Sequence, residues 1–400
     1  MFLYIFILHI AALFNQKARL LIRGEKQALR ELREKVDPTK KYIWFHAASV
    51  GEFEQGRPII ERLKRERPDA AILLTFFSPS GYEMRKDYPL ADIVCYLPFA
   101  TRKRVRQFLN IVPLEKAIFI KYEFWPAYLH RLKHRGIPTY IFATIFNEKQ
   151  LFFKSYGQWY RRLLYCFTHI YVQDTASKEL LHKYGIDNVS IAGDTRFDRV
   201  KAISSNAKPI EMVEQFLGNS RGKVIVAGST WKDDEELLAR YLKENEDARL
   251  ILVPHEIDQH HQHKIFQIFQ GRFVRFTEAT QRNIDTCNML MLNTMGMLSS
   301  IYRYATVAYI GGGFGAGIHN TLEAAVYGVP VIWGPNYQRF REAHGLIAAG
   351  GGFSVSNYAE LKQTMDYCLE HHEDLGKKSM EYVRSELGAT DVIYKGIFES

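Results

Sequence analysis

The chain has 400 residues, of which 47% are apolar and 24% are charged, the balance of an ordinary globular protein rather than of a low-complexity chain. This length is too great for one ordinary domain and suits two domains of about 200 residues each. The formal net charge of +9 favours a nucleic acid, an anionic lipid or a phosphorylated substrate as a partner. The four cysteines are far apart, which argues against a disulfide framework or a zinc site and fits a reducing compartment.

The N-terminus is apolar over residues 1–14, MFLYIFILHIAALF, which is shorter than the roughly 20 residues that span a bilayer. It has no basic start and no convincing cleavage site, so a secretory signal is disfavoured. We interpret residues 1–25 as an interfacial or partly inserted membrane anchor; a full span helped by the following residues and a buried core helix are the alternatives. Basic residues follow the apolar stretch, as expected of a segment attracted to an anionic leaflet, and they predict a cytoplasmic main body. They are Lys17, Arg19, Arg23, Lys26, Arg30, Arg33 and Lys35.

Short β-rich runs then alternate with amphipathic helical patterns. The runs lie at 42–47, 71–77, 92–97, 117–121, 138–143 and 169–173, and again at 223–229, 249–254, 272–276, 288–293, 306–313 and 329–334. This alternation predicts an α/β fold with two tandem Rossmann-like, doubly wound domains, residues 26–199 and 200–400. The stretch VKAISSNAKPIE after Asp198 predicts a linker, and the last helix is expected to pack back on the first domain. Ligands of such sheets bind outside the carboxyl ends of the strands, so we expect a cleft between the domains.

The first candidate site follows the first strand, in HAASVGEFEQ. The chain passes through Ser49 and Gly51 into a helix that is predicted to begin near Glu52, which places the carboxylate at the carboxyl end of the strand. A carboxylate there could remove a proton from an attacking hydroxyl. The alternative is that Glu52 only complements the helix N-terminus electrostatically.

The second candidate site is the glycine-rich loop of YIGGGFGAGIHNTLEAA. Gly312 and Gly313 allow backbone N–H groups to approach a phosphate, and a helix predicted to start near Asn320 would attract it. Glu323 lies one turn further, where it can accept ribose hydroxyls. The alternative is a glycine loop needed only for tight packing of strand and helix.

Further polar or flexible residues follow other strands of the second predicted sheet. Ser229 and Thr230 sit between a strand and a helix, as N-caps, phosphate contacts or both. After the predicted strand 249–254 the candidates are Pro254 and His255 in VPHEI, and after the predicted strand 288–293 they are Met295, Gly296 and Met297 in NTMGML.

The first domain holds further charged candidates. Lys121 and Glu123 stand at a strand end in IKYEFWP, and Arg196 stands in GDTRFD at the end of the domain. Cations there could steady negative charge on a sugar carboxylate or a departing phosphate. The aromatic and basic stretch LFFKSYGQWYRRLLY either faces a lipid acceptor or forms an ordinary half-buried helix.

Several signatures are absent from the sequence. It contains no GxxxxGK[ST] loop, no HExxH, no GxSxG elbow, no DxD-like metal site in a convincing place and no dinucleotide fingerprint after the first strand of either domain. These absences argue against an NTPase, a zinc protease, a serine hydrolase and an NAD enzyme.

The motifs, in their order, resemble those of the transferases of 3-deoxy-manno-octulosonic acid (Kdo) in lipopolysaccharide synthesis. The resemblance covers nearly the whole chain and is carried by HAASVGE, LLTFFSPSGYE, YLPF, EFWP, GDTRFD, AGST, NTMGML, GIHNTLEAA and GVPVIWGPNYQRF. It implies a GT-B glycosyltransferase that moves Kdo from CMP-Kdo to the lipid A disaccharide precursor at the cytoplasmic face of the bacterial inner membrane. It also implies an inverting reaction without metal or cofactor, and no nucleic-acid partner.

By this resemblance Glu52 is the general base. The helix start that holds CMP falls on Asn320, Thr321, Leu322 and Glu323, a further substrate contact falls on 295–297, and the basic residue of GDTRFD is Arg196. Ser49, Gly51 and Glu123 fall on the acceptor side. The chain also departs from the family pattern, with Lys121 for an acidic residue, His255 for an arginine, Met297 for a glutamate and Ile145 for an arginine.

Three other functions stay open. One is another GT-B enzyme, such as a UDP-sugar transferase or a relative of lipid-A-disaccharide synthase. Another is a membrane-tethered nucleotide-binding scaffold without catalysis, which the departures from the family pattern keep open. A nucleic-acid-binding role rests on charge alone and would predict salt-sensitive, sequence-tolerant retention.

Overall fold

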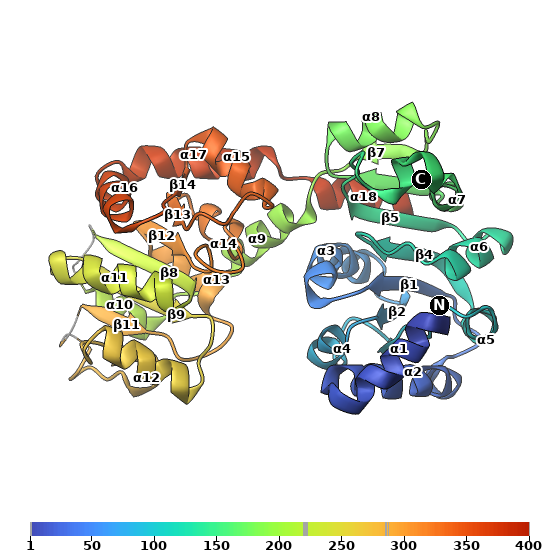
Figure 1. Cartoon of the computed structure of the whole chain (residues 1–400), viewed down its shortest axis with the longest axis horizontal. Coiled ribbons are helices and arrows are strands. Elements are labelled where there is room, and N and C mark those ends of the chain that lie inside the picture. The colour runs from blue at the N-terminus through green and yellow to red at the C-terminus, as the bar shows by residue number, and fades with distance from the viewer. Residues whose placement is uncertain (1, 219–222, 285, 287, 400) are drawn as a thin grey trace. The chain divides into compact units, whose positions relative to one another are not determined.

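The computed structural model describes residues 2–218, 223–284, 286 and 288–399, with side chains from residue 7 onward (Figure 1). The chain forms two compact units. Unit 1 comprises residues 1–199 together with 387–400, and unit 2 comprises residues 200–386. Within the described residues each unit holds one seven-stranded sheet whose paired strands are all parallel.

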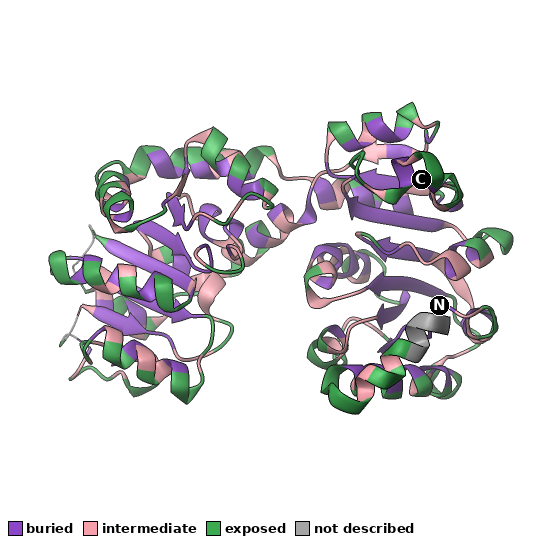
Figure 2. Cartoon of the chain, in the orientation of Figure 1, coloured by how far each residue is buried: buried purple, intermediate pink, exposed green. Residues whose placement is uncertain are grey.

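Unit 1 is a doubly wound sheet with the strand order β3-β2-β1-β4-β5-β6-β7. One face is covered by α2 (Gln16–Lys35), α5, α6 and α8, and the other face is covered by α3 and α18 (Ala389–Phe398). The strands are β1 (Tyr42–Ala47), β2 (Ala71–Phe76), β3 (Ile93–Tyr96), β4 (Leu114–Ile120), β5 (Thr139–Thr144), β6 (His169–Val172) and β7 (Val189–Ile191). The helices between them are α3 (Val50–Glu66), α4 (Pro79–Arg85), α5 (Arg102–Ile111), α6 (Pro126–His134) and α8 (Thr175–Lys183). Every residue of β1, β2 and β5 is buried, because helices lie on both faces (Figure 2).

Unit 2 repeats this architecture with the order β10-β11-β9-β8-β12-β13-β14. Its strands are β8 (Val224–Thr230), β9 (Arg249–Pro254), β10 (Val274–Arg275), β11 (Met289–Met291), β12 (Val307–Ile310), β13 (Val331–Trp333) and β14 (Gly352–Ser354). Its helices are α10 (Glu211–Leu217), α11 (Lys232–Glu244), α12 (Gln259–Ile268), α13 (Leu298–Ile301), α14 (Leu322–Ala325), α15 (Arg341–Ala349), α16 (Tyr358–Glu370) and α17 (His372–Ser385), with short 3-10 turns η4 (Phe276–Glu278) and η5 (Tyr302–Tyr304). The core under one face of this sheet is closed by α11, α12 and α16.

The strand orders fix where a ligand can bind. In unit 1 the chain winds outward from β1 to β3 and returns to β4 beside β1; in unit 2 it runs from β8 through β9 to the edge strand β10, places β11 between β9 and β10, and then returns to β12 beside β8. The crevice at such a reversal, outside the carboxyl ends of the strands, is the usual ligand site of an open parallel sheet. Glu52 and Lys121 follow β1 and β4, whereas Thr230 ends β8 and the glycine loop follows β12.

The N-terminus forms two helices, α1 (Phe2–Phe14) and α2 (Gln16–Lys35), with Asn15 capping the second through its side chain. α2 buries an apolar stripe against unit 1, and the seven basic residues predicted to face a membrane are all exposed. Leu13 and Phe14 of α1 are 71% and 86% exposed. Among the residues that the structure describes, no helix combines the length and apolar character needed to cross a bilayer.

Three local predictions were wrong. The expected linker after Asp198 begins as part of α9 (Thr195–Asn206), whose first turn is held by contacts from the C-terminal segment. Strands β7 and β14 were missed because each has three residues and lies at a sheet edge. The stretch 151–165 is neither one long helix nor half-buried throughout; it breaks into η1 (Leu151–Phe153), η2 (Ser155–Gly157), α7 (Gln158–Arg161) and η3 (Leu164–Cys166).

The C-terminus returns to unit 1 as α18 (Ala389–Phe398). Asp198 accepts hydrogen bonds from the backbone N–H groups of Gly388, at 2.8 Å, and Thr390, at 2.6 Å. Arg62 of α3 contacts Asp391 at 2.7 Å, and Ile393 and Ile397 are buried against the sheet. The final helix is therefore an integral layer of unit 1.

Candidate functional site

Glu52 lies in the first turn of α3, directly after β1. Ser49 is the N-cap residue of that helix, and its hydroxyl donates to Glu52 Oε2 at 2.7 Å. The Glu52 side chain is half-buried, and Gly51 beside it is exposed. The hydroxyl of Ser49 thus fixes the orientation of the carboxylate while the residue stays partly open to solvent.

A buried polar network lies at the same edge of the sheet. His46, next to last in β1, is fully buried, and its Nε2–H donates to Glu123 Oε2 at 3.0 Å. Trp125 donates to the same oxygen at 2.6 Å. On the other side of the imidazole, Nδ1 lies 2.9 Å from the hydroxyl of Thr75, which accepts a hydrogen bond from Trp44 at 2.8 Å. Glu123 is 8% exposed and its position is fixed by two ring N–H groups.

The two basic candidates of unit 1 occupy constrained positions. Lys121 has a left-handed backbone, with φ of 67°, immediately after β4, which turns the chain sharply away from the sheet. Arg196 is held by the buried Asp194, at 2.9 Å from Nε and 2.7 Å from Nη2. The hydroxyl of Thr195 donates to the carbonyl of Gln55 at 2.6 Å, so the segment that carries Arg196 packs on the helix that carries Glu52.

In unit 2 the glycine loop lies against the end of β8. An added Cβ on Gly311 would lie 2.3 Å from the carbonyl oxygen of Ser229, and one on Gly313 would lie 2.5 Å from the backbone nitrogen of Gly334. No side chain fits at either position, so this approach of backbone to backbone requires glycine. Gly312, with φ of 88°, favours glycine because of its left-handed backbone.

Asp234, in the first turn of α11, holds the glycine loop in place through hydrogen bonds. Its carboxylate accepts hydrogen bonds from the backbone N–H of Gly312 at 2.9 Å, the N–H of Trp231 at 3.0 Å and the hydroxyl of Tyr309 at 2.8 Å. Burial raises the pKa of this carboxyl, and the three hydrogen bonds oppose that shift. Asp234 was not predicted as a site residue, because acidic residues are common at helix starts and α11 carries three of them in its first turn.

A second buried carboxylate lies beside it. Glu235 accepts from the hydroxyl of Thr230 at 3.1 Å and contacts His261 Nε2 at 2.9 Å. Burial raises the pKa of Glu235, and the neighbouring imidazole opposes this. These contacts turn the side chain of Thr230 inward, where it is buried. Its neighbour Ser229, which has a left-handed backbone with φ of 54°, stays half-buried.

At the far end of the glycine loop, Asn320 and Glu323 form a hydrogen bond of 3.0 Å, and Asn320 also accepts from the N–H of Leu322 at 3.2 Å. Thr321 and Leu322 are fully buried. The predicted start at Asn320 was wrong: α14 begins at Leu322, its N-cap residue is Thr321, and the helix has only four residues.

Three rings from three different loops meet beside the glycine loop. Trp231 and His255 stack with centroids 4.7 Å apart and planes at 27°; His255 and His319 lie 4.5 Å apart at 30°. The indole N–H of Trp231 points to Nε2 of His319 at 3.4 Å. His255 follows Pro254 at the end of β9, and its backbone N–H donates to Thr230. We refer to Trp231, His255 and His319 as the ring cluster.

The structure gathers some of the predicted residues and leaves others apart. In unit 2 the strand order reverses between β8 and β12, and the predicted residues that meet there are Ser229, Thr230, His255 and the glycine loop. Met295 is 77% exposed and Gly296 has open space around it; within the described residues no hydrogen bond joins 295–297 to the glycine loop. His46, Trp231, Asp234 and His319 were missed. A polar residue inside an otherwise apolar strand was the signal for His46, and a histidine in a glycine-rich loop was the signal for His319.

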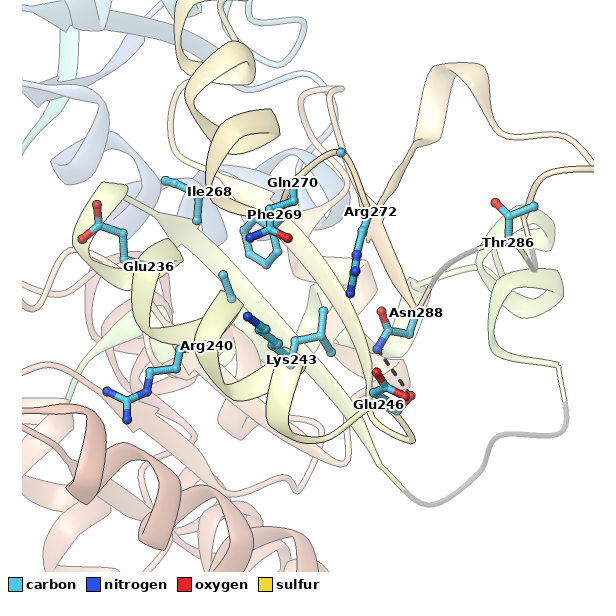
Figure 3. A pocket seen from close by; sticks show the side chains of 13 residues that line it. Glu236, Arg240, Lys243, Glu246, Ile268, Phe269, Gln270, Arg272, Thr286 and Asn288 are labelled. Atoms are coloured by element: carbon cyan, nitrogen blue, oxygen red, sulfur yellow. Dashed lines mark hydrogen bonds between the residues drawn. The ribbon is translucent and has the colours of Figure 1, made fainter.

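A large pocket of unit 2 lies elsewhere. Side chains of α11, the end of α12 and the segments entering β10 and β11 line it, among them Arg240, Lys243, Arg272 and Asn288 (Figure 3). Glu246, Arg272 and Asn288 precede β9, β10 and β11, so the pocket opens at the amino ends of these strands. That edge is opposite to the glycine loop, and we exclude the pocket as the nucleotide site.

Comparison with known proteins gives consistent matches. Residues 22–199 match a family model described as 3-deoxy-D-manno-octulosonic-acid transferase (kdotransferase). A 3-deoxy-D-manno-octulosonic acid transferase of Aquifex aeolicus is 28% identical over 336 residues, which are 82% of this chain and 86% of that protein. Its namesake in Haemophilus influenzae is 25% identical over 373 residues, 88% of this chain and 85% of that protein. These matches confirm the predicted resemblance.

Solved structures share the architecture. A UDP-GlcNAc 2-epimerase of Neisseria meningitidis matches 90% of this chain and 100% of its own with a TM-score of 0.65 and 15% identity. At this identity the match shows the fold alone: two α/β units of the GT-B kind.

Proposed function

We propose that this chain, a glycosyltransferase related to the Kdo transferases, moves Kdo from CMP-Kdo to a hydroxyl of the lipid A disaccharide precursor. The single observation that carries the proposal is the sequence match over most of the chain to proteins of that name. The geometry of Glu52 and of the glycine loop supports it.

In this proposal Glu52 is the general base. Its carboxylate takes the proton of the acceptor hydroxyl, the acceptor oxygen forms a bond to the anomeric carbon of Kdo, and the bond from that carbon to the phosphate of CMP breaks. CMP leaves with the electron pair, and the configuration at the anomeric carbon inverts. The support is positional: Glu52 is oriented by Ser49 at 2.7 Å and is partly open to solvent.

The glycine loop and Asn320 are assigned to the CMP moiety. Backbone N–H groups at a glycine-rich strand-to-helix turn are suited to a phosphate, and Glu323 is suited to ribose hydroxyls. Asp234 holds the loop in place through the backbone N–H of Gly312. Lys121 and Arg196 are assigned to the negative charge of the sugar carboxylate and the departing phosphate. The reaction uses no metal and no cofactor in this scheme.

The lipid acceptor implies work at the cytoplasmic face of the bacterial inner membrane. α1 is assigned to the interfacial anchor, and the exposed basic residues of α2 to the anionic headgroups. The segment 151–165 adds exposed aromatic side chains, with Tyr156 72% and Trp159 62% exposed beside Arg161 and Arg162. Tryptophan and tyrosine favour the membrane–water interface, which supports this segment as a second lipid contact.

The test is transfer of labelled Kdo from freshly generated CMP-Kdo to tetraacyl lipid A precursor, in detergent and EDTA. Glu52→Gln is expected to lower turnover by about 10²–10⁴-fold, the usual contribution of a general base. Glu66→Gln, at the other end of the same helix, is the control and should keep wild-type turnover. Near-normal turnover of Glu52→Gln would refute the role of the base, and competition by UDP but not CMP would reassign the nucleotide.

A further inference from the structure

The ring cluster carries two histidines that the proposed chemistry does not use together. His255 and His319 face each other at 4.5 Å, next to the glycine loop. An added Cβ on Gly312 would lie 3.1 Å from Cδ2 and 3.3 Å from Nε2 of His319, so this imidazole edge lies directly over the loop that is assigned to the phosphate. His255 is exposed and His319 is half-buried, which leaves the pair accessible.

One contact of His319 suits its neutral form. Trp231 directs its indole N–H toward Nε2 of His319 at 3.4 Å, and only a neutral imidazole can accept there. Burial, and next the nearby His255, lower the pKa of His319. A positive charge on His255 would oppose a second positive charge on His319 at this separation, and a bound anion would offset that repulsion.

Resting on the proposed function, we propose that His255 and His319 form an anion-binding pair that takes up one proton when the CMP-sugar binds. His319 exchanges its contact with Trp231 for the anion, and the shared proton balances one negative charge of the ligand. The recognised chemistry is a phosphate or a carboxylate, both of which the sugar nucleotide carries. The positive charge that faces the anion then depends on pH. An arginine at the same place would stay charged at every physiological pH.

The other charged groups near the ring cluster are either buried in hydrogen bonds or remain unchanged when a histidine of the cluster is replaced. Asp234 and Glu235 are buried and hydrogen-bonded beneath it, the latter to His261. The remaining groups on the adjoining segments are Lys232 and Asp233 of α11, Glu256 after β9, Glu323 after the loop, and Arg339, whose side chain donates to the carbonyl of Ala316.

The sign of the pH dependence follows from the lowered pKa of His319 in the free protein. An anion raises that pKa in the complex, so binding takes up a proton at pH values between the free and bound pKa values. Affinity is highest below the free pKa and is lost as pH rises through the bound pKa. At full uptake of one proton, Kd rises about tenfold for each pH unit.

The experiment is isothermal titration calorimetry of the full chain with CMP at pH 7.5, in two buffers of different ionisation enthalpy, which counts the protons taken up. His255→Gln and His319→Gln are compared with His263→Gln, an exposed histidine of α12 that stands apart from the cluster. The titration of the CMP phosphate itself is the same for all proteins and cancels. Cytidine and free Kdo are titrated in parallel, because cytidine carries neither anion and Kdo carries the carboxylate alone.

Wild type and His263→Gln are expected to take up more protons than either cluster variant, and His319→Gln to bind CMP about tenfold more weakly at pH 6.5, the value of one charge-assisted hydrogen bond. Extra uptake with CMP assigns the pair to the phosphate; extra uptake with Kdo alone assigns it to the carboxylate. Equal uptake in all four proteins with both ligands would overturn the inference while leaving CMP binding intact. Absence of CMP binding to wild type would refute the inference together with the proposed function.

Discussion

Replacing Asp234 by alanine is expected to loosen the glycine loop. The carboxylate is 1% exposed and accepts hydrogen bonds from the N–H of Gly312, the N–H of Trp231 and the hydroxyl of Tyr309. Trp231 lies at the surface and water can replace its lost partner. Gly312 and Tyr309 are buried, so the substitution leaves two buried donors without an acceptor.

The magnitude follows from these two donors. Each buried donor left without a partner costs about 1–3 kcal/mol. Removing a carboxylate whose pKa is raised by burial also removes an unfavourable desolvation, so we take the lower part of the range. The expected loss of local stability is about 2–4 kcal/mol, which corresponds to roughly 30- to 1000-fold faster hydrogen exchange where the loop closes faster than its amides exchange.

The assay is native-state hydrogen–deuterium exchange, read on peptides that cover β12 and the glycine loop. Asp233→Ala is the matched control, because this aspartate is the exposed neighbour on the same helical turn. Exchange of the loop at the same rate in Asp234→Ala and Asp233→Ala would refute the bracing role. Asp234→Asn, which keeps one acceptor, should fall between the two.

Three other substitutions test separate parts of the structure. Gly313→Ala places a Cβ 2.5 Å from the backbone of Gly334 and should abolish CMP binding in calorimetry, while unchanged affinity would contradict the close approach of the two segments. Glu123→Ala leaves the buried His46 without its partner and should destabilise unit 1 by about 2–4 kcal/mol in thermal unfolding, whereas Glu123→Gln should cost less. In vesicles of anionic brominated lipid, the fluorescence quenching of wild type should largely disappear in Trp159→Phe; equal quenching of both proteins would exclude the segment 151–165 from the membrane.

The sheets could be predicted from the sequence because their strands are buried on both faces, which makes each an uninterrupted apolar run such as 42–47 or 249–254. The loops at the carboxyl ends could be predicted for the same reason, since the end of such a run marks the edge where ligands bind. This reasoning correctly placed Glu52, Ser229 and the glycine loop at the carboxyl ends of their strands.

What could not be predicted depends on contacts between loops that are far apart in the chain. The ring cluster joins residues 231, 255 and 319, and no local pattern indicates that their side chains meet. Asp234 looks like any acidic residue at a helix start until Gly312 is placed over it. α9 continues into the predicted linker because Asp198 receives hydrogen bonds from residues 388 and 390, a constraint that periodicity cannot reveal.

The return of the last helix to unit 1 has a consequence for how the protein is made. The sheet face of unit 1 that α3 and α18 cover together lacks α18 until the end of the chain has left the ribosome, whereas unit 2 is complete in the chain beforehand. During synthesis unit 2 can therefore finish folding first, while Tyr171 of unit 1, which packs against Gly396 of α18, remains incompletely covered. A premature stop near residue 387 would then destabilise unit 1, although most of unit 1 lies far upstream of the stop. Unit 2, which ends directly before it, would be spared.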